Sequence, residues 1–195
     1  NIMIALYAFV IISFFITIVD IIIRFPLQSE MIDYNDIQAI VINVLALLIQ
    51  IVSFAYGFVN AIRGMLSPKR MGAVITAFFA ATCITGTGNM VIYSNVQIVL
   101  WWIVLIIPNI VGAVATFAYF VSGKKSKIYS IIIYLVAIWG MFRIIYSNYN
   151  LIVHANQYLS MNSTVRLVLE IAIHCLVIYQ TYVLWIKRQN ATDIS

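Results

Sequence analysis

The sequence predicts an all-α integral membrane protein, a bundle of six transmembrane helices whose N- and C-termini are both cytoplasmic. The first observation is composition: 64% of the 195 residues are hydrophobic and 9% are charged, whereas soluble domains carry about 25% charged residues. The second is six continuous apolar runs, each long enough to cross the hydrocarbon core of a bilayer, about 30 Å thick. The third is the uneven placement of Lys and Arg between those runs. Together they predict a multi-pass protein of the cell membrane that is surrounded by lipid bilayer.

The six runs form a single transmembrane domain over residues 1–195. The predicted spans cover about residues 2–23, 37–62, 73–93, 98–121, 128–146 and 165–186. Strands of a membrane barrel would alternate apolar and polar residues, and these runs are continuous, so helices are favoured. A polar loop is expected to open at Pro26. In the third span, Gly86 and Gly88 either let neighbouring helices pack closely or loosen the helix.

The basic residues predict the orientation of the spans. Eight of the 11 Lys and Arg residues fall at three places that a six-span chain puts on one side of the membrane: Arg63, Lys69, Arg70, Lys124, Lys125, Lys127, Lys187 and Arg188. The positive-inside rule makes this side cytoplasmic and places the N-terminus there too. The net charge of +5 belongs to this pattern, so nucleic acid is not an expected partner.

Several ionisable residues interrupt the apolar runs. Arg166, Glu170 and His174 are spaced i, i+4, i+8 on the sixth span, which puts them on one helical stripe. Arg143 lies at a similar depth on the fifth span, and Asp20 lies near the outer end of the first. Because charge in hydrocarbon is costly, we expect Arg143 and Glu170 to pair and the cluster to line an outward-facing polar site. The alternative is that these residues only hold the bundle together or reach the interface.

Other polar residues in the spans give weaker signals. Pro108 should kink the fourth span, and Asn109 beside it is expected to bond the freed carbonyls or a ligand. Asn43, Gln50 and Asn60 on the second span are expected to form hydrogen bonds to other helices. A haem held by His154 and His174 is disfavoured because the two histidines should lie at different depths. Cys83 and Cys175 are expected to be buried as small hydrophobic residues.

No catalytic motif is present in the sequence: it contains no Walker A, HExxH or GxSxG pattern. An enzyme is therefore the least favoured class, and neither a cofactor nor a metal is expected. The favoured function is a small-solute transporter, or the membrane-embedded substrate-binding subunit of one, that takes a small polar solute or ion. The alternatives are a six-span sensor domain of a receptor kinase, or an accessory subunit that packs against partner membrane subunits or a second copy. The candidate substrate-binding residues are Glu170, Arg143, His174, Asp20, Arg166 and Asn109.

Overall fold

The computed structural model describes residues 2–28, 34–92, 96–123, 127–147 and 161–192, and every regular element in them is helical. The helices are α1 (Ile2–Gln28), α2 (Tyr34–Ile62), α3 (Pro68–Ile92), α4 (Val96–Thr116), α5 (Lys127–Ser147) and α8 (Met161–Thr192). A short π-helical segment, η2 (Phe117–Val121), continues α4. Six of these helices are long and apolar enough to span a membrane. The number of spans and their helical nature are thus as the sequence predicts.

Several helices extend beyond the apolar runs that predict them, and α1 and α8 show this most clearly. Helix α1 continues to Gln28, so the loop that was expected to open at Pro26 begins later. Helix α8 begins at Met161 and ends at Thr192, which extends it on both sides of the expected 165–186. The reason is that an apolar run marks the part of a helix suited to lipid, whereas the backbone hydrogen bonds continue through polar flanking residues.

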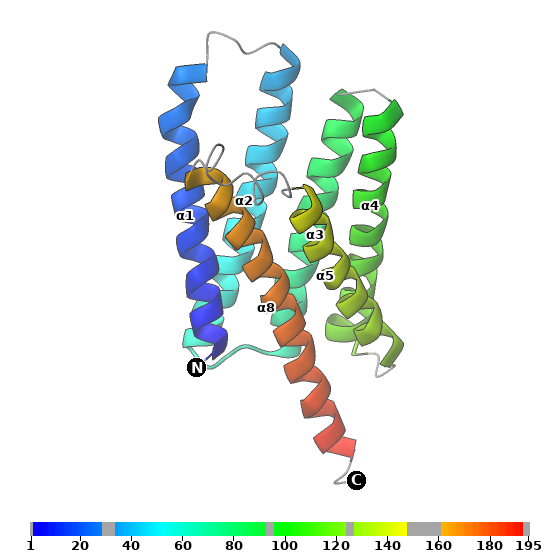
Figure 1. Ribbon diagram of the computed structural model, residues 1–195. Coiled ribbons are helices and arrows are strands. Elements are labelled where there is room, and N and C mark those ends of the chain that lie inside the picture. Colours follow the sequence, from blue (N-terminus) through cyan, green and yellow to red (C-terminus); the bar gives the residue numbers. More distant parts are fainter. Residues whose placement is uncertain (1, 29–33, 93–95, 124–126, 148–160, 193–195) are drawn as a thin grey trace.

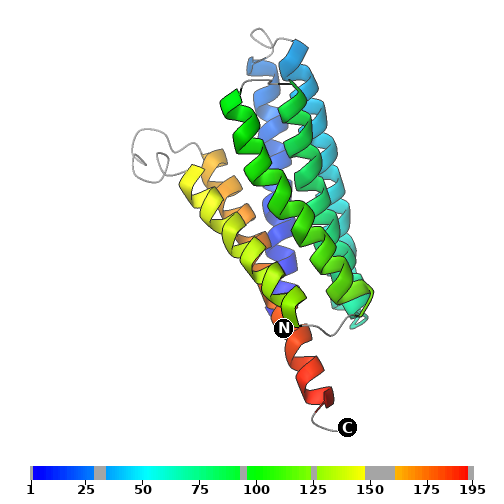
Figure 2. The ribbon, with the colours of Figure 1, turned by 90° about the vertical axis from the view of Figure 1, so that its right-hand side faces the viewer.

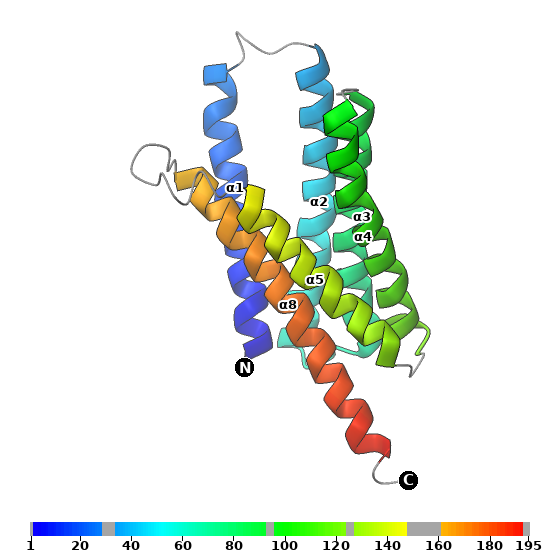
Figure 3. The same ribbon diagram turned by 45° about the vertical axis from the view of Figure 1, so that its right-hand side comes forward.

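The six helices form a closed ring. Each helix packs against the next one along the chain, and α8 returns to pack against α1 (Figure 1). Both chain ends lie at the same end of the bundle, because the chain passes along it six times in alternating directions. Helices α5 and α8 form a hairpin that is inclined to the group α1 to α4, as Figure 3 shows. The last turns of α8 extend beyond the other helices (Figure 2).

The turn between α2 and α3 shows how local chemistry ends one helix and starts the next. Gly64 adopts a φ of 67°, the left-handed conformation that glycine tolerates best after a helix end. Its N–H donates to the Ala61 carbonyl oxygen at 3.2 Å. Ser67 then caps α3, its Oγ accepting the Arg70 N–H at 3.3 Å, and Pro68 takes the first helical position. This tight turn keeps α2 and α3 antiparallel neighbours.

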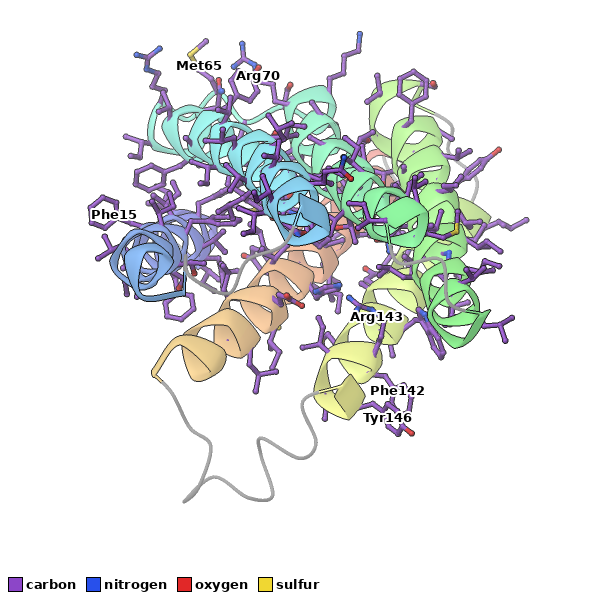
Figure 4. All side chains as sticks on the ribbon, turned by 90° about the horizontal axis from the view of Figure 1, so that it is seen from above. Phe15, Met65, Arg70, Phe142, Arg143 and Tyr146 are labelled. Carbon is purple, nitrogen blue, oxygen red and sulfur yellow. The ribbon has the colours of Figure 1, made fainter. Side chains whose placement is uncertain are left out.

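The exterior of the bundle is apolar. Large hydrophobic side chains are exposed on all six helices, whereas soluble monomers rarely expose apolar patches above a few hundred Å². Phe15 on α1 and Phe142 and Tyr146 on α5 point away from the bundle (Figure 4). Met65 and Arg70, at the junction of α2 and α3, lie at the edge of this view. This exterior indicates a membrane protein.

Close helix packing centres on α3. A Cβ added at Gly86 would lie 2.9 Å from Cγ1 of Ile106 on α4, and one at Gly88 would lie 2.6 Å from Cδ1 of Ile42 on α2. The two glycines therefore let α3 approach a neighbour on each side. Because α3 runs unbroken to Ile92, the close-packing interpretation of these glycines is confirmed, and the idea that they loosen the helix is wrong.

Candidate functional site

Arg143 on α5 and Glu170 on α8 come together at the interface of these two adjacent helices. Both side chains are half-buried, and each lies one helical turn from the direct contact of Gly140 on α5 with His174 on α8, which puts them at the same level of this interface. Arg143 points toward α8 (Figure 4). The adjacent residue Phe142 points outward, and so does Tyr146, which lies four residues after Phe142 on the same face. Helical geometry explains this contrast, because adjacent residues differ by about 100° around the helix axis. The sequence predicts this juxtaposition from the similar depths of the two residues; a role in substrate binding stays a prediction.

His174 lies one turn from Glu170 on the same helix, and it is buried. Its Nδ1 lies 2.7 Å from the Glu170 carbonyl oxygen. A carbonyl oxygen only accepts hydrogen bonds, so Nδ1 carries the proton and Nε2 of the neutral ring has the free lone pair. Arg143 lies three residues after Gly140, the α5 residue that meets this imidazole, and therefore on the same face of α5. The three residues Arg143, Glu170 and His174 are called the charged cluster below.

Two other helices fix the imidazole ring of His174. The Nε2 side packs directly against Gly140 of α5, where an added Cβ would overlap the ring. Phe78 of α3 meets the ring edge-on, with centroids 5.3 Å apart and an interplanar angle of 89°. The histidine is therefore held in one orientation by α8, α5 and α3 together. This geometry agrees with the packing role that a single deep histidine most often has, and it also fixes which nitrogen faces α5.

For two predicted site residues, the structure describes the position along the helix but not the side chain. Asp20 lies on α1, and Arg166 lies on α8 one turn before Glu170. Their side chains lie outside the described residues, so their part in an outward-facing site stays a prediction. His154 also lies outside the described residues.

Asn109 is buried on α4, and its side chain forms a hydrogen bond within that helix. Its Nδ2 donates to the Leu105 carbonyl oxygen at 2.7 Å, and no described contact joins it to the charged cluster. Pro108 lacks the N–H that would bond the carbonyl of Val104. That carbonyl accepts the indole N–H of Trp139 on α5 at 3.4 Å. The prediction that Asn109 bonds the carbonyl freed by the proline is therefore wrong, because a side chain from the neighbouring helix takes this place.

Two expectations about asparagine side chains and one about a cysteine fail in the structure. Asn43 donates to the Ala39 carbonyl and Asn60 to the Tyr56 carbonyl, each at 2.8 Å and within α2. Both amide donors reach back to the preceding turn, so the predicted hydrogen bonds to other helices are wrong for them. Cys175 is exposed rather than buried, because it lies on the outer face of α8.

A pair that sequence reasoning missed lies deeper along α8. Gln180 Nε2 donates to the hydroxyl of Tyr7 on α1, and both side chains are fully buried. The other amide atom, Gln180 Oε1, has no hydrogen-bond partner among the described residues. The Tyr7 ring lies against Gly57 of α2, where a Cβ would come within 2.6 Å of its Cζ. The only signal in the sequence was a glutamine within an apolar run, which does not identify a partner 173 positions away.

Aromatic rings connect this pair to the charged cluster. Ring centroids are 6.2 Å apart between Tyr7 and Phe54, 6.3 Å between Phe54 and Phe78, and 5.3 Å between Phe78 and His174. The line runs from α1 through α2 and α3 to α8. The Tyr7–Gln180 pair and the charged cluster are thus joined through the rings of Phe54 on α2 and Phe78 on α3.

No set of three or more His, Cys, Asp or Glu side chains suited to a metal ion occurs among the described residues. Comparison of the chain with protein-family models, curated proteins and solved structures finds no match.

Proposed function

We propose that this chain is a multi-pass membrane protein that binds and transports a small polar solute or ion, alone or as the substrate-binding subunit of a larger transporter. The observation that carries the proposal is the placement of Arg143, Glu170 and His174 at one level of the contact between two membrane-length helices. Ionisable groups inside spans are costly and tend to face substrate pathways.

Partial exposure distinguishes the charged cluster from a sealed structural ion pair. Arg143 and Glu170 are half-buried, whereas His174 behind them is buried. A buried ion pair adds little to stability over well-packed apolar residues, so helix packing alone gives weak reason to place these charges here. Half-buried groups with a rigid histidine behind them offer a solute a charged surface on a fixed support.

The proposal includes an orientation and a location. The exposed side chains of Arg63, Lys69, Lys127 and Lys187 belong to helix ends that the positive-inside rule assigns to the cytoplasm. Both termini are then cytoplasmic, and the apolar exterior contacts the lipid of the cell membrane. The same exterior leaves room for partner membrane subunits or a second copy of the chain.

The test is solute-dependent stabilisation of the full chain in lipid nanodiscs. Thermal unfolding is followed with a panel of amino acids, sugars, carboxylates and inorganic cations, because a ligand at 100 times its Kd stabilises by about 2.7 kcal/mol. A stabilising solute should lose its effect in Arg143→Gln, and the pH dependence of its effect should change in Glu170→Gln. The matched control is Asn43→Leu, which removes an exposed side chain that bonds only its own helix in the described structure. Equal stabilisation in all three variants would remove the charged cluster from the proposal.

A sensor domain is the second candidate, favoured by one observation. Helix α8 carries the charged cluster and extends beyond the rest of the bundle at its C-terminal end (Figure 1). A ligand that moved α8 would move this extension with it. Solute uptake into lipid vesicles whose membrane contains the protein distinguishes the two candidates. A stabilising solute that also accumulates inside the vesicles supports transport, whereas a solute that binds without crossing the membrane supports sensing.

A further inference from the structure

We infer that the charged cluster takes a carboxylate-bearing solute at Arg143, and that Glu170 takes up one proton when this solute binds. The inference rests on the proposed function, since it names the solute class of the same site. It follows from the facing positions of Arg143 and Glu170, each one turn from the Gly140–His174 contact between α5 and α8, and from the orientation of His174.

The two partners of the pair differ in how they lose their charge. An arginine guanidinium stays protonated in proteins, whereas a carboxylate accepts a proton. The pair therefore opens without leaving two unpaired charges only when Glu170 becomes neutral. Arg143 keeps its positive charge and takes an anion. A cation bound at Glu170 would instead leave Arg143 half-buried without its partner, which makes cations the poorer ligands.

The chemistry of Glu170 identifies the class of anion. The incoming ligand takes the place of a carboxylate beside a guanidinium, and a second carboxylate has the geometry to form two parallel N–H···O bonds with that guanidinium. One proton from water forms an O–H bond on Glu170 while the solute carboxylate binds Arg143. The net charge of the site is zero before and after the exchange, so no uncompensated charge is left between the helices.

His174 is the other group in the cluster that accepts a proton, but its contacts disfavour this. Its Nδ1 proton is already donated to the Glu170 carbonyl, and Nε2 lies against Gly140. A proton on Nε2 would add a second cation beside Arg143. The helices packed on α8 are α1, α3 and α5. Their other described titratable side chains include no carboxylate: Tyr7 on α1, Lys69, Arg70 and Cys83 on α3, and Lys127, Tyr129, Tyr134 and Tyr146 on α5. Glu170 is thus the proton acceptor.

The experiment is calorimetric titration of the full chain in nanodiscs with sodium L-lactate, with sodium chloride as the reference salt. Measurement in two buffers of different ionisation enthalpy gives the number of protons taken up. We expect about one proton per lactate, and an apparent affinity that weakens about tenfold per pH unit above the pH at which Glu170 ionises. Glu170→Gln should bind lactate with no proton uptake at any pH. Arg143→Lys, which keeps the charge but loses the two parallel bonds, should bind about tenfold or more weakly.

Two companion measurements keep the outcomes distinct. Glu170→Asp retains a carboxylate and should retain uptake of about one proton, which separates proton binding from misfolding in Glu170→Gln. Lactate binding without proton uptake in the wild type, or unchanged uptake in Glu170→Gln, overturns the inference and leaves the proposed function standing. If uncharged solutes stabilise the protein and lactate does not bind, the inference is also overturned and the proposed function also stands. If no member of the panel binds, the proposed function fails with it.

Discussion

Replacing Gly140 with alanine tests the contact that holds His174 between α5 and α8. The new Cβ would overlap Nε2 of the imidazole and lie 2.6 Å from Cδ2 and 3.2 Å from Cε1, whereas carbon atoms in contact normally lie about 3.5–4.0 Å apart. The ring has little room to retreat, because Phe78 packs against it at a centroid distance of 5.3 Å. The helices must therefore separate, or the ring must turn and lose its 2.7 Å bond to the Glu170 carbonyl.

The expected cost of this substitution is set by two terms. Overpacking a tight contact costs about 1–3 kcal/mol, and losing one hydrogen bond costs about 0.5–1.5 kcal/mol. Alanine is the better helix former and offsets about 0.5–1 kcal/mol. The net loss of unfolding free energy in Gly140→Ala should be roughly 1–4 kcal/mol.

The assay is a double-mutant cycle on purified protein in detergent, with denaturant unfolding followed by tryptophan fluorescence. In a His174→Ala background the obstructing ring is gone, so Gly140→Ala should be neutral or slightly stabilising. Energies of independent sites add within about 0.5 kcal/mol. If Gly140→Ala costs the same in both backgrounds within that margin, the contact does not hold His174 and the reasoning is refuted.

The remaining predictions concern hydrogen bonds and backbone geometry, and unfolding free energy measures each of them. Trp139→Phe should lose about 0.5–1.5 kcal/mol, and little in a Pro108→Ala background, where the helix supplies its own N–H; an equal loss in both would show that the indole bond is not involved. Tyr7→Phe should cost about 1–3 kcal/mol because it leaves the Gln180 amide without a partner, and adding Gln180→Leu should recover part of that loss; no recovery would count against the pair. Gly64→Ala should cost about 1–2 kcal/mol because of its positive φ, and an unchanged stability would contradict the turn geometry.

The six spans were predictable because the length and apolarity of a run are local properties. Within the described residues each predicted run lies on one helix, with η2 continuing α4 over the fourth run, because consecutive residues must cover the hydrocarbon. The exact ends were less predictable, as Gln28 and Thr192 show. Polar residues at helix ends satisfy the backbone as well as loop residues do, and hydropathy does not distinguish the two.

The charged cluster was partly predictable for a different reason. Depth along a helix follows from counting residues, so Arg143 and Glu170 were expected at the same level. The rotation of each helix about its axis depends on packing with all its neighbours, and this rotation determines which residue each side chain contacts. It turned Asn109 toward its own helix and brought Gly140 against His174. The pairing of Tyr7 with Gln180 also required knowledge that the first and last helices meet.

That meeting of the first and last helices sets the order in which the molecule is completed. Tyr7 is synthesised 173 residues before Gln180, and ribosomes add about 5–20 residues per second, so its hydroxyl waits on the order of 10–30 s for this partner. During that interval the contacts of Tyr7 with Gly57 and Phe54 are available as soon as α2 is made. Closure of the ring is therefore a late event in biogenesis, and a ribosome that stalls before α8 leaves an open bundle with a polar group on its unsealed edge.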